Sequence, residues 1–216
     1  RGFDILPDGT HGTSGFLTEK EMREFLELSP TGKTEGMILG KDKKHPDDPD
    51  AYALYVAHRM VAGDNNNLLC IGAPGSGKTT LLRSIARELV RQQKILSVID
   101  ERRELFAGNT HGEALDVLAG LPKGQAVQMA LRTLSPQVIL LDELGGLDEV
   151  TALEQGLFSG VDFIATLHAA TPEEATMRPQ VKYLMERGAV RVLVWLTSRQ
   201  APRSEEHTSE LQSLRE

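Results

Sequence analysis

A glycine-rich segment between an apolar run and a helical pattern constrains this chain more than any other feature. The apolar residues 68–71 predict a buried strand, and residues 72–79 fill the G-x-x-x-x-G-K-[ST] phosphate-loop pattern at every fixed position. Residues 78–92 then carry apolar side chains at helical spacing. Glycine-rich turns between a strand and a helix are common, but a turn that fills the whole pattern in this setting predicts a site for the phosphates of a nucleotide.

The chemistry of a phosphate site explains the residue types in this loop. Glycines let successive backbone N–H groups point inward at an anion, and the helix N-terminus behind them adds roughly half a positive charge. Lys78 is expected to reach the β- and γ-phosphates of ATP, and the Thr79 hydroxyl to ligate Mg²⁺. The residues expected to bind the nucleotide are Gly72, Ala73, Pro74, Gly75, Ser76, Gly77, Lys78, Thr79 and Thr80.

A second apolar run supplies the acids that such a site needs. Residues 138–141 predict a central strand, and Asp142 and Glu143 follow at its C-terminal end, where ligands bind in parallel sheets. Asp142 is placed to hold Mg²⁺, and Glu143 to activate the attacking water as a general base. The alternative is a solvated strand end, but beside a phosphate loop the pair favours hydrolysis of ATP.

Two further groups are candidates at neighbouring strand ends. His168 ends the apolar run 163–167, and we interpret it as a catalytic residue close to the γ-phosphate, although a structural histidine is the alternative. Asp100 and Glu101 follow the run 95–99. They are expected either to help coordinate the nucleotide and its water or to form an ion-paired loop, and the residues alone do not decide between these.

Apolar runs and helical patterns alternate from residue 68 onward and predict a doubly wound α/β core with a mostly parallel sheet flanked by helices. The expected strands are 68–71, 95–99, 138–141, 163–167 and 190–195, and the expected helices are 78–92, 123–134, 147–158 and 172–187.

The segments on either side of this core have a different character. A helix is expected from Thr18 to before Pro30 and another over 50–62, with a polar loop between them. Residues 1–64 are interpreted as a partial N-terminal region and 65–202 as the P-loop core. The stretch 203–213 resembles the translation of a common sequencing adapter, so residues 203–216 are expected not to be native.

Composition excludes several classes of protein. The 216 residues are 40% apolar and 25% charged, which is typical of a globular protein. No apolar run approaches the ~20 residues that span a bilayer, so we expect a cytoplasmic location with at most peripheral membrane association. A net charge of −7 argues against nucleic acid as a partner. The single cysteine excludes an internal disulfide, and a buried thiol is expected.

The order and spacing of these motifs resemble a known family over residues 66–200. The segments that carry the resemblance are the phosphate loop, 98–102, 121–123, 131–139, 142–145 and 160–168. Together they are similar to the stage III sporulation protein AA family, relatives of the type II and type IV secretion ATPases. Gly146 departs from the charged or polar residue usual there, and residues 1–64 show only a faint similarity in the stretch 6–9.

The resemblance implies more than the residues do by themselves. It implies a RecA-like P-loop NTPase core and a homo-oligomeric ring, a hexamer, that hydrolyses ATP. The ring would serve membrane-embedded channel proteins between mother cell and forespore during endospore formation. Asp100 and Glu101 would correspond to the acidic box of secretion ATPases, and His168 to their histidine box.

Two other interpretations remain open. One is a nucleic-acid-associated ATPase, like a plastid and cyanobacterial branch that shares much of this core. The other is a scaffold that binds ATP and scarcely turns it over. Glu143 distinguishes the scaffold from the enzyme, because a protein that only binds ATP has no need of that carboxylate.

Overall fold

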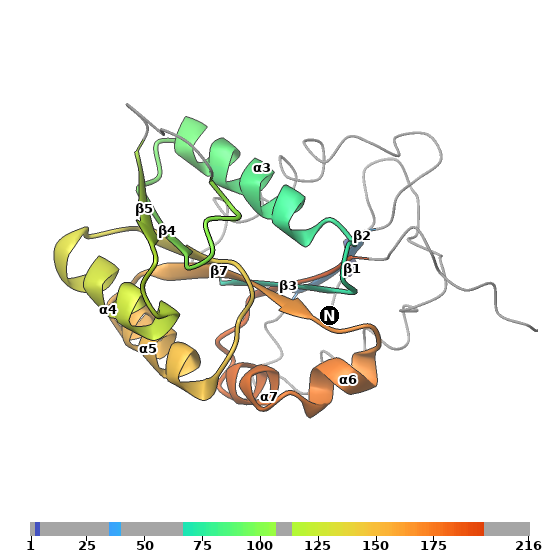
Figure 1. The fold of residues 1–216 in the computed structure, drawn as a ribbon. Coiled ribbons are helices and arrows are strands. Elements are labelled where there is room, and N and C mark those ends of the chain that lie inside the picture. The colour runs from blue at the N-terminus through green and yellow to red at the C-terminus, as the bar shows by residue number, and fades with distance from the viewer. Residues whose placement is uncertain (1–2, 5–34, 40–66, 107–113, 197–216) are drawn as a thin grey trace, which may run out of the picture.

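The computed structural model describes residues 3–4, 35–39, 67–106 and 114–196 (Figure 1). Their strands form one eight-stranded sheet in the order β1-β2-β8-β3-β7-β6-β4-β5, and every pair of neighbours is parallel. The strands are β1 (Phe3–Asp4), β2 (Glu35–Leu39), β3 (Leu68–Gly72), β4 (Leu96–Asp100), β5 (Leu115–Ala119), β6 (Val138–Leu141), β7 (Asp162–His168) and β8 (Val192–Leu196). The expected α/β fold with a parallel sheet is confirmed.

All five strands expected from apolar runs are present, with bounds that agree to within two residues. The structure adds β5 at the edge of the sheet, which the sequence pattern did not indicate. Its residues read Leu-Asp-Val-Leu-Ala, and only the first is fully buried. Because an edge strand is covered less completely than a central one, it lacks the continuous apolar run that marks the others. The strand β2 was not expected either, because it lies in the stretch between residues 30 and 50 for which a polar loop was expected.

Helices flank the sheet at α3 (Lys78–Arg91), α4 (Lys123–Thr133), α5 (Leu147–Phe158), α6 (Pro172–Met177) and α7 (Pro179–Glu186). The single helix expected over 172–187 is wrong, since two helices meet there at Arg178. That residue has an extended backbone, φ −70° and ψ 119°, and Pro179 follows it. A proline disfavours helical geometry in the residue before it, which explains the break.

Several expectations fall outside the described residues. These are the helices over 18–30 and 50–62, the boundary near residue 64, and the tail 203–216. The described strand β2 pairs in parallel with β8, from Glu35↔Val192 to Leu39↔Leu196, so a segment of the N-terminal region joins the same sheet as the core.

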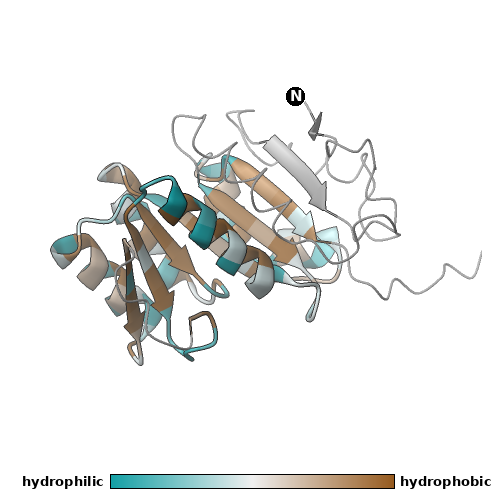
Figure 2. Ribbon diagram, turned by 90° about the horizontal axis from the view of Figure 1, so that it is seen from above, coloured by the Kyte–Doolittle hydropathy of each residue, from teal (hydrophilic) through white to brown (hydrophobic). Residues whose placement is uncertain are grey.

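The sheet lies between α3 on one face and α4, α5, α6 and α7 on the other (Figure 1), and an apolar core fills each side. Alternate residues of β3 point to opposite faces: Leu69 and Ile71 pack with residues of α4, α5, α6 and α7, whereas Leu68 and Cys70 pack with residues of α3. The strands are hydrophobic in Figure 2, and the covering helices carry hydrophilic residues. Burial raises the pKa of the Cys70 thiol to about 12, so this residue acts as a small apolar side chain, as expected.

Parallel pairing brings the C-terminal ends of the strands to one edge of the sheet. Gly72 of β3 lies beside His168 of β7, and Leu141 of β6 lies beside Ala165 of β7. The next strand over is β4, which ends at Asp100. Residues from four separate parts of the chain therefore meet where the strands end.

Candidate nucleotide site

The phosphate loop joins β3 to α3, and its glycines are required for two different reasons. Gly75 and Gly77 have φ values of 74° and 98°, a left-handed region in which a side chain is strained. Gly72 has no such φ, but a Cβ there would lie 2.6 Å from Ser76 Oγ and 2.8 Å from the Leu196 carbonyl oxygen. The first glycine is thus fixed by close packing against β8, and the other two by the turn.

Lys78 is folded back into this loop. Its Nζ donates hydrogen bonds to the carbonyl oxygens of Gly72 and Ala73, both at 2.8 Å, and the residue is only 4% exposed. Burial lowers the pKa of Lys78 below its ordinary value, while the nearby carboxylates of Asp142 and Glu143 act to raise it. The two acids are therefore close enough to the loop to interact electrostatically with its cation.

The loop also contains a polar atom without a partner. Ser76 Oγ is buried and has no hydrogen-bond partner within the described part of the chain. Buried hydroxyl groups are nearly always hydrogen-bonded, so an unpaired one marks a place where a ligand can bind. Thr79 is half-buried and Thr80 exposed, both in the first turn of α3. These residues fit a nucleotide phosphate bound by Lys78, Ser76 and the N-terminus of α3.

Asp142 and Glu143 lie directly after β6 and are tied to β7 by Thr166. The Glu143 N–H donates to Thr166 Oγ1 at 2.9 Å, and this hydroxyl donates to Asp142 Oδ1 at 3.2 Å. Burial raises the pKa of Asp142, and the hydrogen bond from Thr166 partly opposes that rise. Among the described residues Asp142 accepts this one side-chain bond, which leaves lone pairs of a half-buried carboxylate for a cation.

The structure brings the side chains of Glu143 and His168 together. Glu143 Oε2 lies 4.0 Å from His168 Nε2, and both side chains are partly exposed, at 44% and 39%. His168 Nδ1 is buried and finds no hydrogen-bond partner in the described chain. The backbone joins this histidine to the phosphate loop, since the Ala169 N–H donates to the Gly72 carbonyl oxygen at 3.2 Å.

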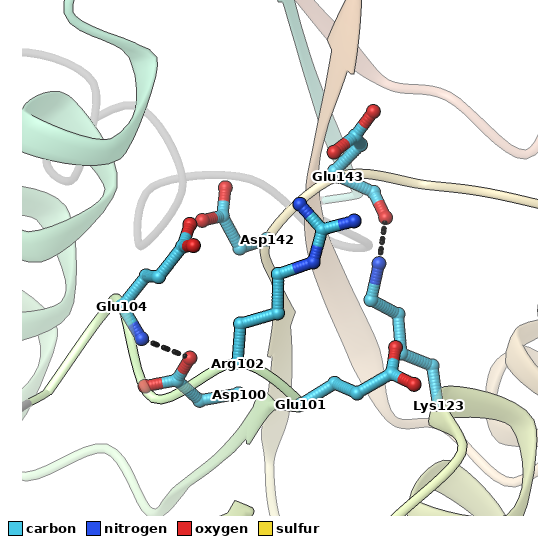
Figure 3. A pocket seen from close by; sticks show the side chains of 7 residues that line it. All are labelled: Asp100, Glu101, Arg102, Glu104, Lys123, Asp142 and Glu143. Carbon is cyan, nitrogen blue, oxygen red and sulfur yellow. Dashed lines mark hydrogen bonds between the residues drawn. The ribbon is translucent and has the colours of Figure 1, made fainter. Parts of the chain in front are cut away.

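Asp100 lies at the same sheet edge, but its carboxylate is occupied by the backbone. Oδ1 accepts from the Glu104 N–H at 2.8 Å, and Oδ2 accepts from the N–H groups of Leu105 and Phe106 at 2.9 and 3.0 Å. Glu101 is exposed. Both acids line a pocket (Figure 3) together with Arg102, Glu104, Lys123, Asp142 and Glu143. A contact of Asp100 or Glu101 with the nucleotide remains a prediction.

Three residues at the site carried no signal that identified their place in it. Thr166 links the two acids, as described above. Lys123 Nζ donates to the Glu143 carbonyl oxygen at 2.6 Å, and Gln180 Nε2 donates to the Gly145 carbonyl oxygen at 2.7 Å. Lysine and glutamine are ordinary residues on helices, and only the folded chain shows which carbonyl each one reaches.

A dedicated metal cage is not part of this site. Within residues 67–106 and 114–196, no group of three or more His, Cys, Asp or Glu side chains could hold a metal ion. Mg²⁺ at nucleotide sites is usually bound by one or two protein oxygens together with phosphates and water. Thr79 and Asp142 could supply those oxygens.

No helix in the described ranges combines the length and apolarity needed to cross a membrane.

Comparison with known proteins gives relatives that are longer than this chain. Stage III sporulation protein AA of Bacillus subtilis (strain 168) is 34% identical over an alignment of 134 residues, which covers 57% of this chain and 44% of that protein. The Arabidopsis thaliana protein SEEDLING PLASTID DEVELOPMENT 1 is 28% identical over an alignment of 140 residues, which covers 59% of this chain and 20% of that protein. The chain therefore spans less than half the length of these curated relatives.

The crystal structure of the VirB11 ATPase from the Brucella suis type IV secretion system resembles this one with a TM-score of 0.49 and 22% identity. That similarity covers 82% of this chain and 46% of VirB11.

The sequence profile of the Sporulation stage III, protein AA family matches residues 52–207. Because this match covers more than half of the chain and includes every motif of the site, the chain belongs to the Sporulation stage III, protein AA family.

Proposed function

We propose that this chain is a Mg²⁺-dependent ATPase that hydrolyses ATP to ADP and phosphate. The observation that carries the proposal is the short distance between Glu143 and His168, 4.0 Å. Both residues lie at the edge of the sheet where β3 ends and the phosphate loop begins. A protein that only held a nucleotide would need the loop. It would not need a partly exposed carboxylate at the end of β6, which is separated from β3 only by β7.

Each residue has a defined part in the proposed reaction. Lys78, already surrounded by the loop carbonyls, exchanges those contacts for the β- and γ-phosphates of ATP. Thr79 and Asp142 hold Mg²⁺, which neutralises charge that develops on the phosphates. Glu143 accepts a proton from the attacking water as the oxygen bonds to the γ-phosphorus and the bond to the ADP oxygen breaks. His168 contacts the γ-phosphate side of the site.

The wider role follows from family membership and goes beyond the geometry. We propose a cytoplasmic homo-oligomeric ring, a hexamer, that associates peripherally with membrane-embedded channel proteins on the mother cell side of the forespore. Its core would be residues 65–202, with 1–64 as a partial N-terminal region and 203–216 as a non-native tail. The name and family of the Bacillus subtilis relative support the sporulation setting.

Replacement of the loop lysine tests the proposal. Lys78→Ala should weaken binding of a fluorescent ATP analogue by about 100-fold, because it removes charge-assisted hydrogen bonds to phosphate of about 1.5–3 kcal/mol. Phosphate release from ATP should require Mg²⁺ in the parent chain and be lost in the variant. The control is Lys182→Ala on α7, an exposed lysine (67%) that should change neither measurement. Equal affinity in Lys78→Ala and the parent chain would contradict the proposed site.

A further inference from the structure

The turn that carries Glu143 has an uncommon backbone conformation. Glu143 has φ 55°, in the left-handed region, where a residue other than glycine is strained. Such conformations persist only where the surroundings hold them. The position of the Glu143 carboxylate depends on this backbone, because φ and ψ set the direction in which its side chain leaves the chain.

Side chains from four separate elements hold the backbone from 143 to 145. Thr166 of β7 accepts from the Glu143 N–H, and its own carbonyl accepts from the Leu144 N–H at 2.7 Å. Glu149 of α5 accepts from the Gly145 N–H at 2.7 Å. The two remaining bonds, from Lys123 of α4 and Gln180 of α7, are donated to the carbonyl oxygens of Glu143 and Gly145.

Lys123 lies where helix stability alone would not place a cation. It is the first residue of α4, and no acidic residue or side-chain cap stands in that turn. Positive charge at a helix N-terminus opposes the helix dipole. The pocket around it contains five carboxylates (Figure 3), yet the ion pairs between described residues do not include Lys123. Its ammonium is instead hydrogen-bonded to the carbonyl of the residue assigned as the base.

We propose that Lys123 is a positioning residue for ATP hydrolysis. Thr166 fixes the N–H side of Glu143 and Lys123 fixes its carbonyl side, so together they define both backbone torsions of Glu143. Gln180 holds the carbonyl of Gly145, two residues further along the same turn. This inference rests on the proposed function, because it assigns a task to Lys123 through the residue that activates water.

The test compares Lys123→Met, which keeps the length of the side chain and removes the donor, with Lys123→Arg, which restores a donor. Lys123→Met should lower kcat by about 10- to 100-fold, the usual effect of a catalytic group misplaced by about 1 Å, while affinity for the ATP analogue stays within about twofold. Lys123→Arg should recover most of the lost kcat. Lys182→Met on α7 is the matched control and should behave as the parent chain.

Amide hydrogen exchange gives a second readout that does not depend on turnover. In the nucleotide-free chain, Lys123→Met should speed exchange of the Leu144 and Gly145 amides by about tenfold or more, because the turn opens more often without its donor. Folding of each variant is checked by the fluorescence of the buried Trp195. Should Lys123→Met fail to fold, Gln180→Leu removes the other donor from a different helix and should show the same pattern with a smaller loss of kcat.

The outcomes separate this inference from the proposed function. A parent chain without phosphate release contradicts the proposed function and with it the catalytic task of Lys123, and exchange at 144–145 then tests only whether Lys123 holds the turn. Normal turnover in the parent chain and equal kcat in Lys123→Met would overturn the inference alone. It is also overturned if Lys123→Met weakens ATP binding as much as it lowers kcat, which would make Lys123 a phosphate ligand, or if exchange at 144–145 is unchanged.

Discussion

The neighbouring strands β4 and β6 both end in an Asp-Glu pair, yet the two pairs have different surroundings. Ile99 of β4 lies beside Leu141 of β6, so Asp100 and Asp142 follow at equivalent places on the sheet edge. Asp100 is 2% exposed, and its two oxygens accept three backbone hydrogen bonds. Asp142 is half-buried and accepts one side-chain bond, from Thr166, among the described residues.

The loop after each strand causes this difference. After β4 the chain turns back through Arg103, with φ 58°, and presents the amides of residues 104–106 to the Asp100 carboxylate. After β6 the turn at Glu143 directs its N–H to Thr166 instead, and no described amide reaches Asp142. The direction of the following N–H groups therefore decides whether the acid at a strand end anchors its loop or keeps its carboxylate oxygens open to other partners.

The largest expected effect concerns the second acid of the β6 pair. Glu143→Gln should retain ATP binding and lower the rate of phosphate release by about 100- to 10,000-fold, the range for loss of a general base. Phosphate release under saturating Mg²⁺-ATP is the measurement. Glu186→Gln, a 57% exposed glutamate at the end of α7, is the control. Undiminished turnover in Glu143→Gln would assign the base elsewhere and remove the functional distinction between the two strand ends.

A smaller effect is expected when the first acid of the β4 pair is removed. Asp100→Ala takes the acceptor from three amides, including that of the buried Leu105, and should lower the free energy of unfolding by about 3 kcal/mol. Denaturant unfolding followed by Trp195 fluorescence measures this. The exposed Asp116 of β5 provides the control, Asp116→Ala, with little change. A loss under about 0.5 kcal/mol would show that the Asp100 carboxylate does not anchor its loop.

The smallest effect concerns Asp142, and here the substitution should stabilise the folded chain rather than destabilise it. Because burial raises its pKa, the ionised carboxylate is less stable in the folded chain than in the unfolded chain. Asp142→Asn should therefore raise the free energy of unfolding at pH 7, by less than about 1 kcal/mol since the group is partly solvated.

The pH dependence checks that reason. As pH falls through the raised pKa of the folded state, Asp142 takes up a proton, and the free-energy cost of burying its charge in the parent chain disappears. The advantage of Asp142→Asn should shrink toward zero below the ordinary value of 3.8. Unfolding curves of both chains at several pH values measure this difference. A variant less stable than the parent at pH 7 would mean that Asp142 anchors structure as Asp100 does.

Much of the fold could be predicted because buried parallel strands are continuous apolar runs. The run Val-Ile-Leu-Leu at 138–141 shows this, and all its residues are buried in β6. The edge strand β5 was missed because Asp116 interrupts its apolar residues and, among the described strands, it is paired on one side only. The break between α6 and α7 had a signal in Pro179, which the helical spacing over 172–187 obscured.

At the site, sequence could predict residues within motifs but not their partners. The phosphate loop, Asp142 and Glu143 could be predicted because each follows directly on an apolar run along the chain. That Asp100 binds backbone amides depends on the course of the loop after it. The contact between Lys123 and Glu143 joins residues 20 positions apart in the sequence, one at the start of a helix and the other after the end of a strand. Such contacts are set by the packed fold and leave no local pattern.

The buried thiol of β3 has a practical consequence for the study of this protein. Cys70 is the only cysteine in the chain, it is fully enclosed in a central strand, and its pKa of about 12 keeps it protonated at neutral pH. Thiol-directed dyes and spin labels can therefore be attached to cysteines introduced on the surface without first replacing the natural one. Under denaturing conditions the same atom becomes a reporter, since its modification marks the opening of the sheet centre.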